Sequence, residues 1–442
     1  MMVGFVFASI VYSVLVGFLA NSYIIVKQIP QMLLPVVLVF LLINTCAGIL
    51  IARGQNKKIK MCCHGTILLI CFSVSVVISI AYHIPMAIQY LPQDHAVFFW
   101  SLLYCVVAHF VIFWNGIICV YLSSAQLGLK MRVIGALCGM IPVANLICLF
   151  LIMKTTVKEL RFETEREQIN IQRKKDKVCA TKYPILLVHG VFFRDTKFFN
   201  YWGRIPGELE RNGASVYYGN QPSAASIADS AEFLKTRIAQ IIEQTGAEKV
   251  NIIAHSKGGL DCRYAIAKLG IGDHVASLTT INTPHRGCLF ADYLLNVIPA
   301  DVKNKVADTY NSTLRKMGDA EPDFLAAVND LTDAFCQRLD VQMPIPQGIY
   351  CQSVGSVLTH AKGGKFPLNL SYHLVKYFDG ENDGLVSEKS FQWGEKYILL
   401  RDTSQYGISH GDMIDLNRAN IEGFDVREFY VNLVHDLKKR GL

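Results

Sequence analysis

The stretch Val250-Asn251-Ile252-Ile253-Ala254-His255-Ser256-Lys257-Gly258-Gly259 decides the fold of the C-terminal part of this chain. Its first residues form an apolar run typical of a buried strand, and a helix is expected to begin at Gly258. A serine on such a tight strand-to-helix turn is a nucleophile elbow. The small residues two places before and after it, Ala254 and Gly258, let helix and strand approach closely. Because short patterns of small residues recur by chance, the prediction depends on the remaining catalytic groups.

Apolar runs alternate with helical periodicity on both sides of this elbow. Strands are expected at 184–190, 215–219, 249–254 and 276–283, and helices at 206–213, 227–245 and 259–269. This alternation predicts a mainly parallel sheet with helices on both faces. A mostly helical insertion, 290–343, interrupts the pattern. Strands then return at 349–354 and 397–400, and a last helix is expected at 426–439.

The first third of the chain is far less charged than the rest. Residues 1–153 hold seven basic residues and one acidic residue. Five apolar runs lie there, each long enough to cross about 30 Å of hydrocarbon as a helix. The sequence therefore predicts an all-α transmembrane region over 1–153 with four or five spans, since Gly139 and Pro142 also suit a re-entrant fifth run. The five runs are Gly4–Val26, Met32–Ile51, Thr66–Leu91, Val97–Leu122 and Val133–Met153.

A charged connector, 154–182, follows the last apolar run. The spacing of its acidic and basic residues supports a solvated helix, expected to continue the last membrane helix as a spacer. Binding of Arg173-Lys174-Lys175 to anionic lipid headgroups is the alternative. The basic residues of 53–60 favour a cytoplasmic loop, whereas a full fifth span would carry the C-terminal part outside. The side of the membrane that holds 183–442 is therefore left open.

Charge and cysteine content exclude two further classes of protein. The formal net charge of +7 is concentrated in the N-terminal loops, and no basic patch with interleaved aromatic residues is present. Nucleic acid is therefore not an expected partner, and protein partners are not indicated. The 13 cysteines form neither a regular disulfide framework nor a C-x-x-C zinc pair.

The serine nucleophile needs a general base that a carboxylate orients. In hydrolases with this elbow, the acid comes later in the chain than the serine. The segment Asn382-Asp383-Gly384-Leu385-Val386 forms a tight turn anchored by two apolar residues, so Asp383 is the expected acid. Asp379 and Glu381 are the alternatives.

The base follows the acid in this chain order. His410 stands in a loop with a glycine on either side, before the last helix, and is the expected base. His360 and His373 compete with it, but neither follows a plausible acid on a late strand. His435 lies on the terminal helix, where it is expected to be helical surface.

Backbone N–H groups are expected to stabilise the oxyanion that forms when the serine attacks. One belongs to Lys257, the residue after the nucleophile. The other belongs to Val191, in the loop after the first strand, where Gly190 lets the backbone turn. His189 is expected to be a structural turn residue.

From Tyr183 onward the chain resembles the bacterial triacylglycerol lipases of the α/β-hydrolase fold, especially those of pseudomonads. The resemblance rests on stretches in family order over residues 183–412, and it says nothing about 1–153. It implies Ser256, Asp383 and His410 as the triad and Val191 and Lys257 as oxyanion donors. With the apolar spans of 1–153, the expected location is integral to a membrane, the bacterial cell membrane. The stretches lie at 183–190, 201–206, 212–217, 249–259, 283–287, 291–295, 298–299, 382–386 and 410–412.

The resemblance also implies a structural calcium ion near the histidine loop, although the chemistry itself requires no cofactor. Asp412 matches one calcium ligand. Leu416 stands where the family has a polar ligand, and no other carboxylate clearly matches. The alternative is that Asp412 caps a helix beginning near Asp415.

The insertion at 290–343 matches the lid region of these lipases. Leu294, with Leu295, Val297 and Ile298, is expected to form an apolar face that opens at a lipid surface; a permanently packed helix is the alternative. Phe192 and Phe193, beside the oxyanion loop, are expected to line an acyl pocket with Leu294.

Three functions fit these features. The first is a membrane-anchored serine hydrolase that cleaves carboxylic ester bonds of lipids through an acyl-enzyme on Ser256. The second is an acyltransferase, thioesterase, amidase or phospholipase with the same triad, because the acyl-enzyme is common to all of them. The third is a non-catalytic membrane docking module, against which the intact triad argues.

Overall fold

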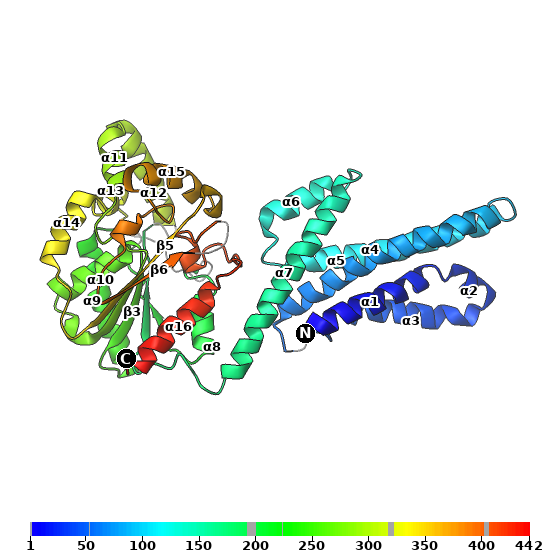
Figure 1. The fold of residues 1–442 in the computed structure, drawn as a ribbon, viewed down its shortest axis with the longest axis horizontal. Coiled ribbons are helices and arrows are strands. Elements are labelled where there is room, and N and C mark those ends of the chain that lie inside the picture. The colour runs from blue at the N-terminus through cyan, green and yellow to red at the C-terminus, as the bar shows by residue number, and fades with distance from the viewer. Residues whose placement is uncertain (1, 53, 192–199, 223, 317–321, 402–405) are drawn as a thin grey trace. The chain divides into compact units, whose positions relative to one another are not determined.

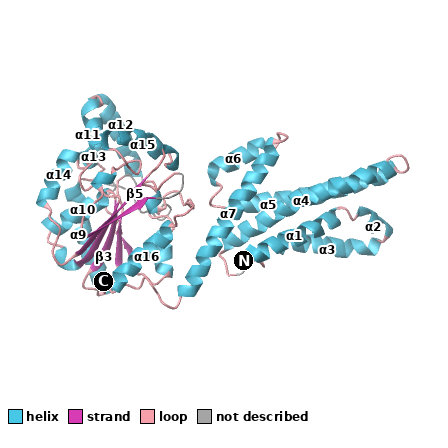
Figure 2. Cartoon of the chain, in the orientation of Figure 1, coloured by secondary structure: helices cyan, strands magenta, loops and turns pink. Residues whose placement is uncertain are grey.

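A computed structural model describes residues 2–52, 54–191, 200–222, 224–316, 322–401 and 406–442. The chain divides into two compact units, Met1–Gln172 and Arg173–Leu442. The first contains helices alone among its described residues, and the second contains a sheet flanked by helices (Figures 1 and 2). We describe each unit by itself.

The first unit is a set of apolar helices. Three of them, α1, α4 and α5, are long and apolar enough to cross a membrane by length and composition. Helices α4 and α5 pack along each other, with α1 against α4. Its elements are α1 Met2–Ala20, α2 Tyr23–Gln28, η1 Pro30–Met32, α3 Leu33–Cys46, α4 Lys57–Tyr90, α5 His95–Ser123, α6 Gly128–Cys138 and α7 Ala144–Arg173.

Two of the five apolar runs do not form a single helix that is long enough to cross a membrane, so the count of four or five spans stays a prediction. The run Met32–Ile51 forms a helix of only 14 residues, Leu33–Cys46, which at 1.5 Å per residue is about 21 Å long. The run Val133–Met153 is broken between α6 and α7. Val143, just after Pro142, has a φ of 67°, which no α-helix accommodates. Gly139 and Pro142, the two residues that suit a re-entrant run, both lie in this break. Helix α7 then continues without interruption into the charged connector.

The second unit is built on six parallel strands in the order β2-β1-β3-β4-β5-β6. Alternate residues of β1 face opposite layers: Ile185 and Leu187 pack with α8 and α16, whereas Leu186 and Val188 pack with α9 and α10. The sheet is thus covered on both faces, and the predicted α/β-hydrolase fold is confirmed. The strands are β1 Ile185–Val188, β2 Val216–Tyr218, β3 Val250–His255, β4 Val275–Ile281, β5 Tyr350–Val357 and β6 Lys396–Arg401.

The strand order reverses beside β1, because the chain adds β2 on one side of it and then β3 on the other. Ligands of parallel sheets bind beyond the carboxyl ends of the strands at such a switch point. The flanking helices are α8 Ile205–Arg211, α9 Ile227–Thr245, α10 Lys257–Lys268 and α16 Val426–Lys439, with the short η2 Gly272–His274 before β4.

The segment between β4 and β5 is helical, as predicted for the insertion, and α15 follows β5. Figure 1 shows α11, α12, α13 and α15 gathered at one end of this unit. No pattern in the sequence predicted α15. The elements are α11 Leu289–Val297, α12 Ala300–Lys316, α13 Phe324–Asn329, α14 Asp333–Gln342, η3 Ala361–Gly363, α15 Leu368–Asp379, η4 Glu388–Ser390 and η5 Asp412–Ile414.

Candidate active site

Ser256 stands on a strained turn between β3 and α10. Its backbone has φ 54° and ψ −133°, a conformation that costs a non-glycine residue free energy and that marks nucleophile elbows. The turn is tight on both sides. A Cβ on Gly258 would lie 2.4 Å from the carbonyl oxygen of His189, and one on Gly190 would lie 2.7 Å from the Cβ of Ser256. Glycine at both positions therefore lets the first strand and the elbow meet.

The structure brings the predicted acid and base together. His410 Nδ1 lies 2.6 Å from Asp383 Oδ2, and the backbone N–H of His410 donates to the carbonyl oxygen of Asp383 over 2.9 Å. Asp383 is fully buried, whereas His410 keeps 7% of its surface. Among the alternatives, Glu381 pairs with Arg401 at the surface, and His360 is exposed.

Four donors hold the Asp383 carboxylate. Besides His410, the backbone N–H groups of Leu385 and Val386 donate to Oδ1 over 2.9 and 2.8 Å, and Asn282 Nδ2 donates to Oδ2 over 2.5 Å. The two residues that follow the Asn-Asp-Gly turn therefore donate to its carboxylate, and Asn282 reaches the carboxylate from the end of β4. A buried carboxylate needs such compensation because burial disfavours its charge.

The histidine lies beside the elbow. The ring centroids of His410 and His255, the residue before the nucleophile, are 4.4 Å apart. Burial, followed by the electrostatic effect of the neighbouring His410, holds the pKa of His255 well below its usual range, so His255 stays neutral. No hydrogen bond joins Ser256 to His410 in the part of the chain that the structure describes. Such bonds often tighten only when substrate binds.

Lys257 directly follows Ser256, and Val191 directly follows Gly190, where an added Cβ would lie 2.7 Å from Ser256 Cβ. The N–H of Lys257 opens helix α10, and its side chain turns away to Asp261 Oδ1 and Ser230 Oγ, at 2.6 and 3.2 Å. Val191 is buried against Ala224, Ala327 and Leu331. Both backbone N–H groups are thus carried by segments whose side chains are anchored elsewhere.

Tyr201 links these two segments and was not singled out by the sequence. Its hydroxyl accepts the N–H of Gly190 over 3.0 Å and lies 2.7 Å from His255 Nδ1. His189 is fully buried, with its ring nitrogens 2.8 and 3.0 Å from the carbonyl oxygens of Gly190 and Gln221. The oxyanion loop and the elbow are therefore joined through one phenol.

The predicted acyl pocket is only partly described. Phe192 and Phe193 lie outside the described residues. Leu294 belongs to helix α11, but its side chain is not among those described. On the same helix Val297 is 56% exposed, while Leu295 is half-buried. Helix α11 thus has an exposed apolar residue at Val297, and its opening as a lid stays a prediction.

The residues around Asp412 do not form the expected calcium site. Asp412 Oδ2 accepts the N–H and hydroxyl of Ser409, over 2.9 and 2.6 Å, and Leu416 packs into the apolar core. Within the described residues no group of three or more His, Cys, Asp or Glu could hold a metal ion. Calcium takes six to eight oxygen ligands, so these residues do not fit it.

The alternative for Asp412 is also wrong. Within residues 406–442, all of which are described, the next helix after Asp415 is α16 at Val426, and Asp415 has a left-handed φ of 54°. Asp412 instead starts a single 3-10 turn and closes it back onto Ser409.

A parallel sheet with a serine elbow and a buried histidine–carboxylate pair defines an α/β-hydrolase. Residues 183–362 match the alpha/beta hydrolase fold family. A triacylglycerol lipase of Vibrio cholerae is 31% identical over 288 residues, which are 59% of this chain and 89% of that protein. The chain therefore belongs to the triacylglycerol lipase family of α/β-hydrolases.

Two other similarities concern shorter or more distant matches. A triacylglycerol lipase of Pseudarthrobacter phenanthrenivorans is 38% identical over 172 residues, 36% of this chain, and the match spans about half, 53%, of that relative's length. The mature lipase BlEst2 of Bacillus licheniformis superposes with a TM-score of 0.44 at 21% identity, over 58% of this chain and 92% of that one.

Proposed function

We propose that this protein is a membrane-anchored serine hydrolase that cleaves carboxylic ester bonds of lipids. The observation that carries the proposal is the 2.6 Å pairing of His410 with the buried Asp383, beside the strained elbow of Ser256. Ser256 Oγ attacks the ester carbonyl and His410 accepts its proton. Asp383 holds the ring and stabilises the imidazolium that forms.

The acyl-enzyme formed on Ser256 is then hydrolysed. The N–H groups of Val191 and Lys257 stabilise the oxyanion in both steps, each donor contributing about 3 kcal/mol to the transition state. His410 returns its proton to the leaving alcohol and activates the incoming water. No step requires a metal or cofactor.

The family relationship supports the choice of ester substrates, because the curated relatives are named triacylglycerol lipases. The three helices long and apolar enough to span a membrane support the anchor. A membrane anchor on the same chain as the active site supports lipid esters as the substrates.

The test uses the full-length chain purified in detergent and assayed with p-nitrophenyl esters of several chain lengths. Ser256→Ala is expected to lower kcat by at least about 10³-fold. Ser215→Ala is the matched control, since Ser215 is an exposed serine before β2. Full activity in Ser256→Ala, or no activity in the wild type, would contradict the proposal.

A panel of thioesters, phospholipids and alternative acyl acceptors separates hydrolysis of neutral esters from the other reactions of an acyl-enzyme. A fluorophosphonate probe applied to intact membranes adds an independent readout, since it labels only an activated serine. Absence of label on Ser256 would favour the docking-module alternative.

A further inference from the structure

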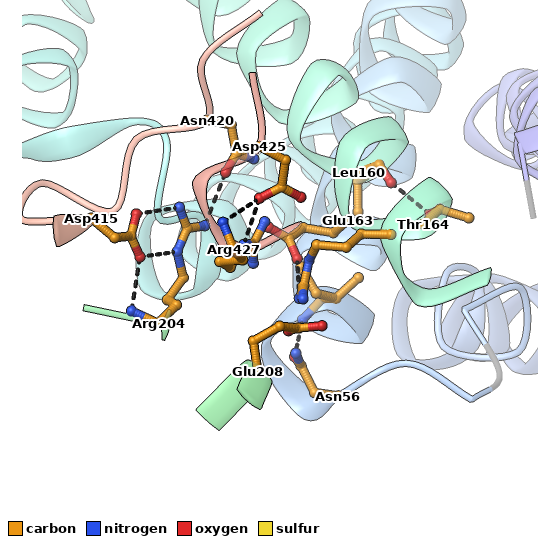
Figure 3. A network of polar contacts seen from close by, with 12 residues as sticks. Asn56, Leu160, Glu163, Thr164, Arg204, Glu208, Asp415, Asn420, Asp425 and Arg427 are labelled. Atoms are coloured by element: carbon orange, nitrogen blue, oxygen red, sulfur yellow. Dashed lines mark hydrogen bonds and ion pairs between the residues drawn. The ribbon is translucent and has the colours of Figure 1, made fainter. Parts of the chain in front are cut away.

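Arg204 forms a salt bridge with the loop that contains His410, although Arg204 itself lies in a distant part of the sequence. It lies immediately before α8, and its guanidinium meets the buried carboxylate of Asp415, five residues after His410. Nε and Nη2 donate to Oδ2 and Oδ1 over 2.7 and 2.8 Å, and the Arg204 backbone N–H donates to Oδ2 over 2.8 Å. Nη1 donates to Asn420 Oδ1 over 2.9 Å. Figure 3 shows the guanidinium between these two acceptors.

The two segments fit closely around this contact. Gly203 has φ 54°, and a Cβ there would lie 2.4 Å from the carbonyl oxygen of Asp415. Asp415 is itself left-handed, with φ 54°, a conformation that a non-glycine residue keeps only when its surroundings enforce it. The salt bridge and the backbone geometry therefore fix the same point of the loop.

Local hydrogen bonds connect Asp415 to the segment that contains His410. Asp415 N–H donates to Asp412 O over 3.0 Å, and Leu416 N–H donates to Gly411 O over 3.0 Å. Asp412 is bonded in turn to Ser409, the residue before His410. These hydrogen bonds connect Asp415 through Asp412 to Ser409, so a shift of Asp415 is expected to move His410 as well.

The charge balance requires a cation at this position. The Asp415 side chain is 1% exposed, and a buried carboxylate without a compensating charge is strongly destabilising. A guanidinium is suited to this role because it donates in a planar fork to both carboxylate oxygens at once. Lysine at this position would supply the charge without the second bond.

We propose that Arg204 is a positioning residue that fixes the 407–416 loop and its His410, and that this internal cation makes the enzyme independent of calcium. The proposal rests on the function proposed above. Two observations on this chain support it: Asp412 and Leu416 do not provide a calcium site among the described residues, and the next carboxylate along the chain, Asp415, is already neutralised by a side chain of the same protein.

The experiment compares the wild type with Arg204→Met, Arg204→Lys and Asp415→Asn in the full-length protein in detergent. We expect Arg204→Met to lower kcat for a short soluble ester by up to about 100-fold, because a misplacement of a catalytic group by about 1 Å can cost that much, with KM unchanged. The rate at which a fluorophosphonate labels Ser256 should fall by the same factor. Arg204→Lys should recover part of both rates, and excess EGTA should change neither activity nor the melting temperature of the wild type.

Hydrogen–deuterium exchange of peptides covering 407–416 measures the positioning directly, whether or not the protein hydrolyses esters. Exchange should speed up in Arg204→Met and Asp415→Asn. Arg263→Met is the matched control, because Arg263 is a buried arginine paired with Asp340 over 2.7 Å. It should lower the melting temperature without faster exchange at 407–416.

Wild-type kcat and wild-type exchange at 407–416 in a folded Arg204→Met protein would overturn the proposal. So would loss of wild-type activity in EGTA that calcium restores. If the wild type neither hydrolyses esters nor is labelled, the proposed function fails, and the exchange measurement alone then decides whether Arg204 fixes the loop.

Discussion

Asn282 and His410 share one oxygen atom of the buried acid. Asn282 Nδ2 donates to Asp383 Oδ2 over 2.5 Å, and His410 Nδ1 lies 2.6 Å from the same oxygen. Asn282 Nδ2 also donates to Ser356 Oγ over 2.7 Å, so a residue at the end of β4 connects the acid to β5. This contact limits how far the carboxylate can turn away from the histidine.

Removing the Asn282 side chain should therefore slow catalysis. A hydrogen bond to a charged group contributes about 1.5–3 kcal/mol, so we expect kcat to fall about tenfold or more in Asn282→Gly, with KM unchanged. Glycine is the informative variant because Asn282 has φ 48°, which glycine adopts without strain. Steady-state kinetics check this, and wild-type kcat in Asn282→Gly would show that the contact is not needed.

Comparison with Asn282→Ala separates the two effects of the residue. Alanine removes the same amide but is strained at a positive φ, which costs about 1–2 kcal/mol. We expect both variants to lose kcat equally and only Asn282→Ala to lose additional stability in thermal unfolding.

Tyr201→Phe tests the link between the oxyanion loop and the elbow. Without the hydroxyl, the buried N–H of Gly190 loses its acceptor and His255 Nδ1 loses its partner, at a cost of about 1–3 kcal/mol for an unsatisfied buried group. We expect lower stability in denaturant unfolding. We also expect a lower kcat, because Gly190 directly precedes Val191, the expected oxyanion donor. Tyr217→Phe on β2 is the control, and equal effects of the two variants would argue against a role specific to Tyr201.

The sequence predicted the parts of this site that have their own local pattern. Ser256 follows a buried strand and precedes small residues, Asp383 occupies an Asn-Asp-Gly turn, and His410 lies between glycines before the last helix. Each is a property of neighbouring residues, and the order along the chain joins them. The parallel sheet followed from the same alternation of strands and helices.

The contacts that support this site have no local pattern. Asn282 and Asp383 are 101 positions apart, and Arg204 and Asp415 are 211 apart, so no periodicity connects them. The only available signal was an asparagine directly after a buried strand, a residue that tolerates a positive φ. In the membrane region, Gly139 and Pro142 did indicate a possible interruption of the fifth run, and the structure has a break at Val143, the residue after Pro142.

Gly258→Ala should destabilise the fold at the elbow. The added Cβ would lie 2.4 Å from the carbonyl oxygen of His189, and backbone atoms cannot move aside as a flexible side chain can. Overpacking of this kind costs about 1–3 kcal/mol. Gly207→Ala in α8 is the matched control, because nothing lies within 4 Å of its added Cβ, and alanine there should stabilise the helix by about 0.5–1 kcal/mol. Denaturant unfolding at neutral pH distinguishes the two, and equal effects would contradict the close approach at Gly258.

His285 should make the stability of the protein fall in mild acid. Arg263 Nη1 lies 3.1 Å from His285 Nδ1, and an arginine can only donate, so Nδ1 carries no proton and Nε2 donates to Thr280 Oγ1 over 2.9 Å. Burial, followed by the charges of Arg263 and Arg286, holds the pKa of His285 well below its usual range. The folded protein therefore keeps this ring neutral, whereas the unfolded chain binds a proton below about pH 6.5.

The unfolded state then binds more protons than the folded state, so stability is lost as the pH falls below 6.5, at up to about 1.4 kcal/mol per pH unit for each such histidine. His285→Gln, which cannot titrate, should reduce this slope by one proton while leaving a constant offset between pH 7 and 8. Denaturant unfolding followed by tryptophan fluorescence at a series of pH values measures both. An unchanged slope below pH 6.5 would contradict the neutral His285 ring that the Arg263 contact at Nδ1 indicates.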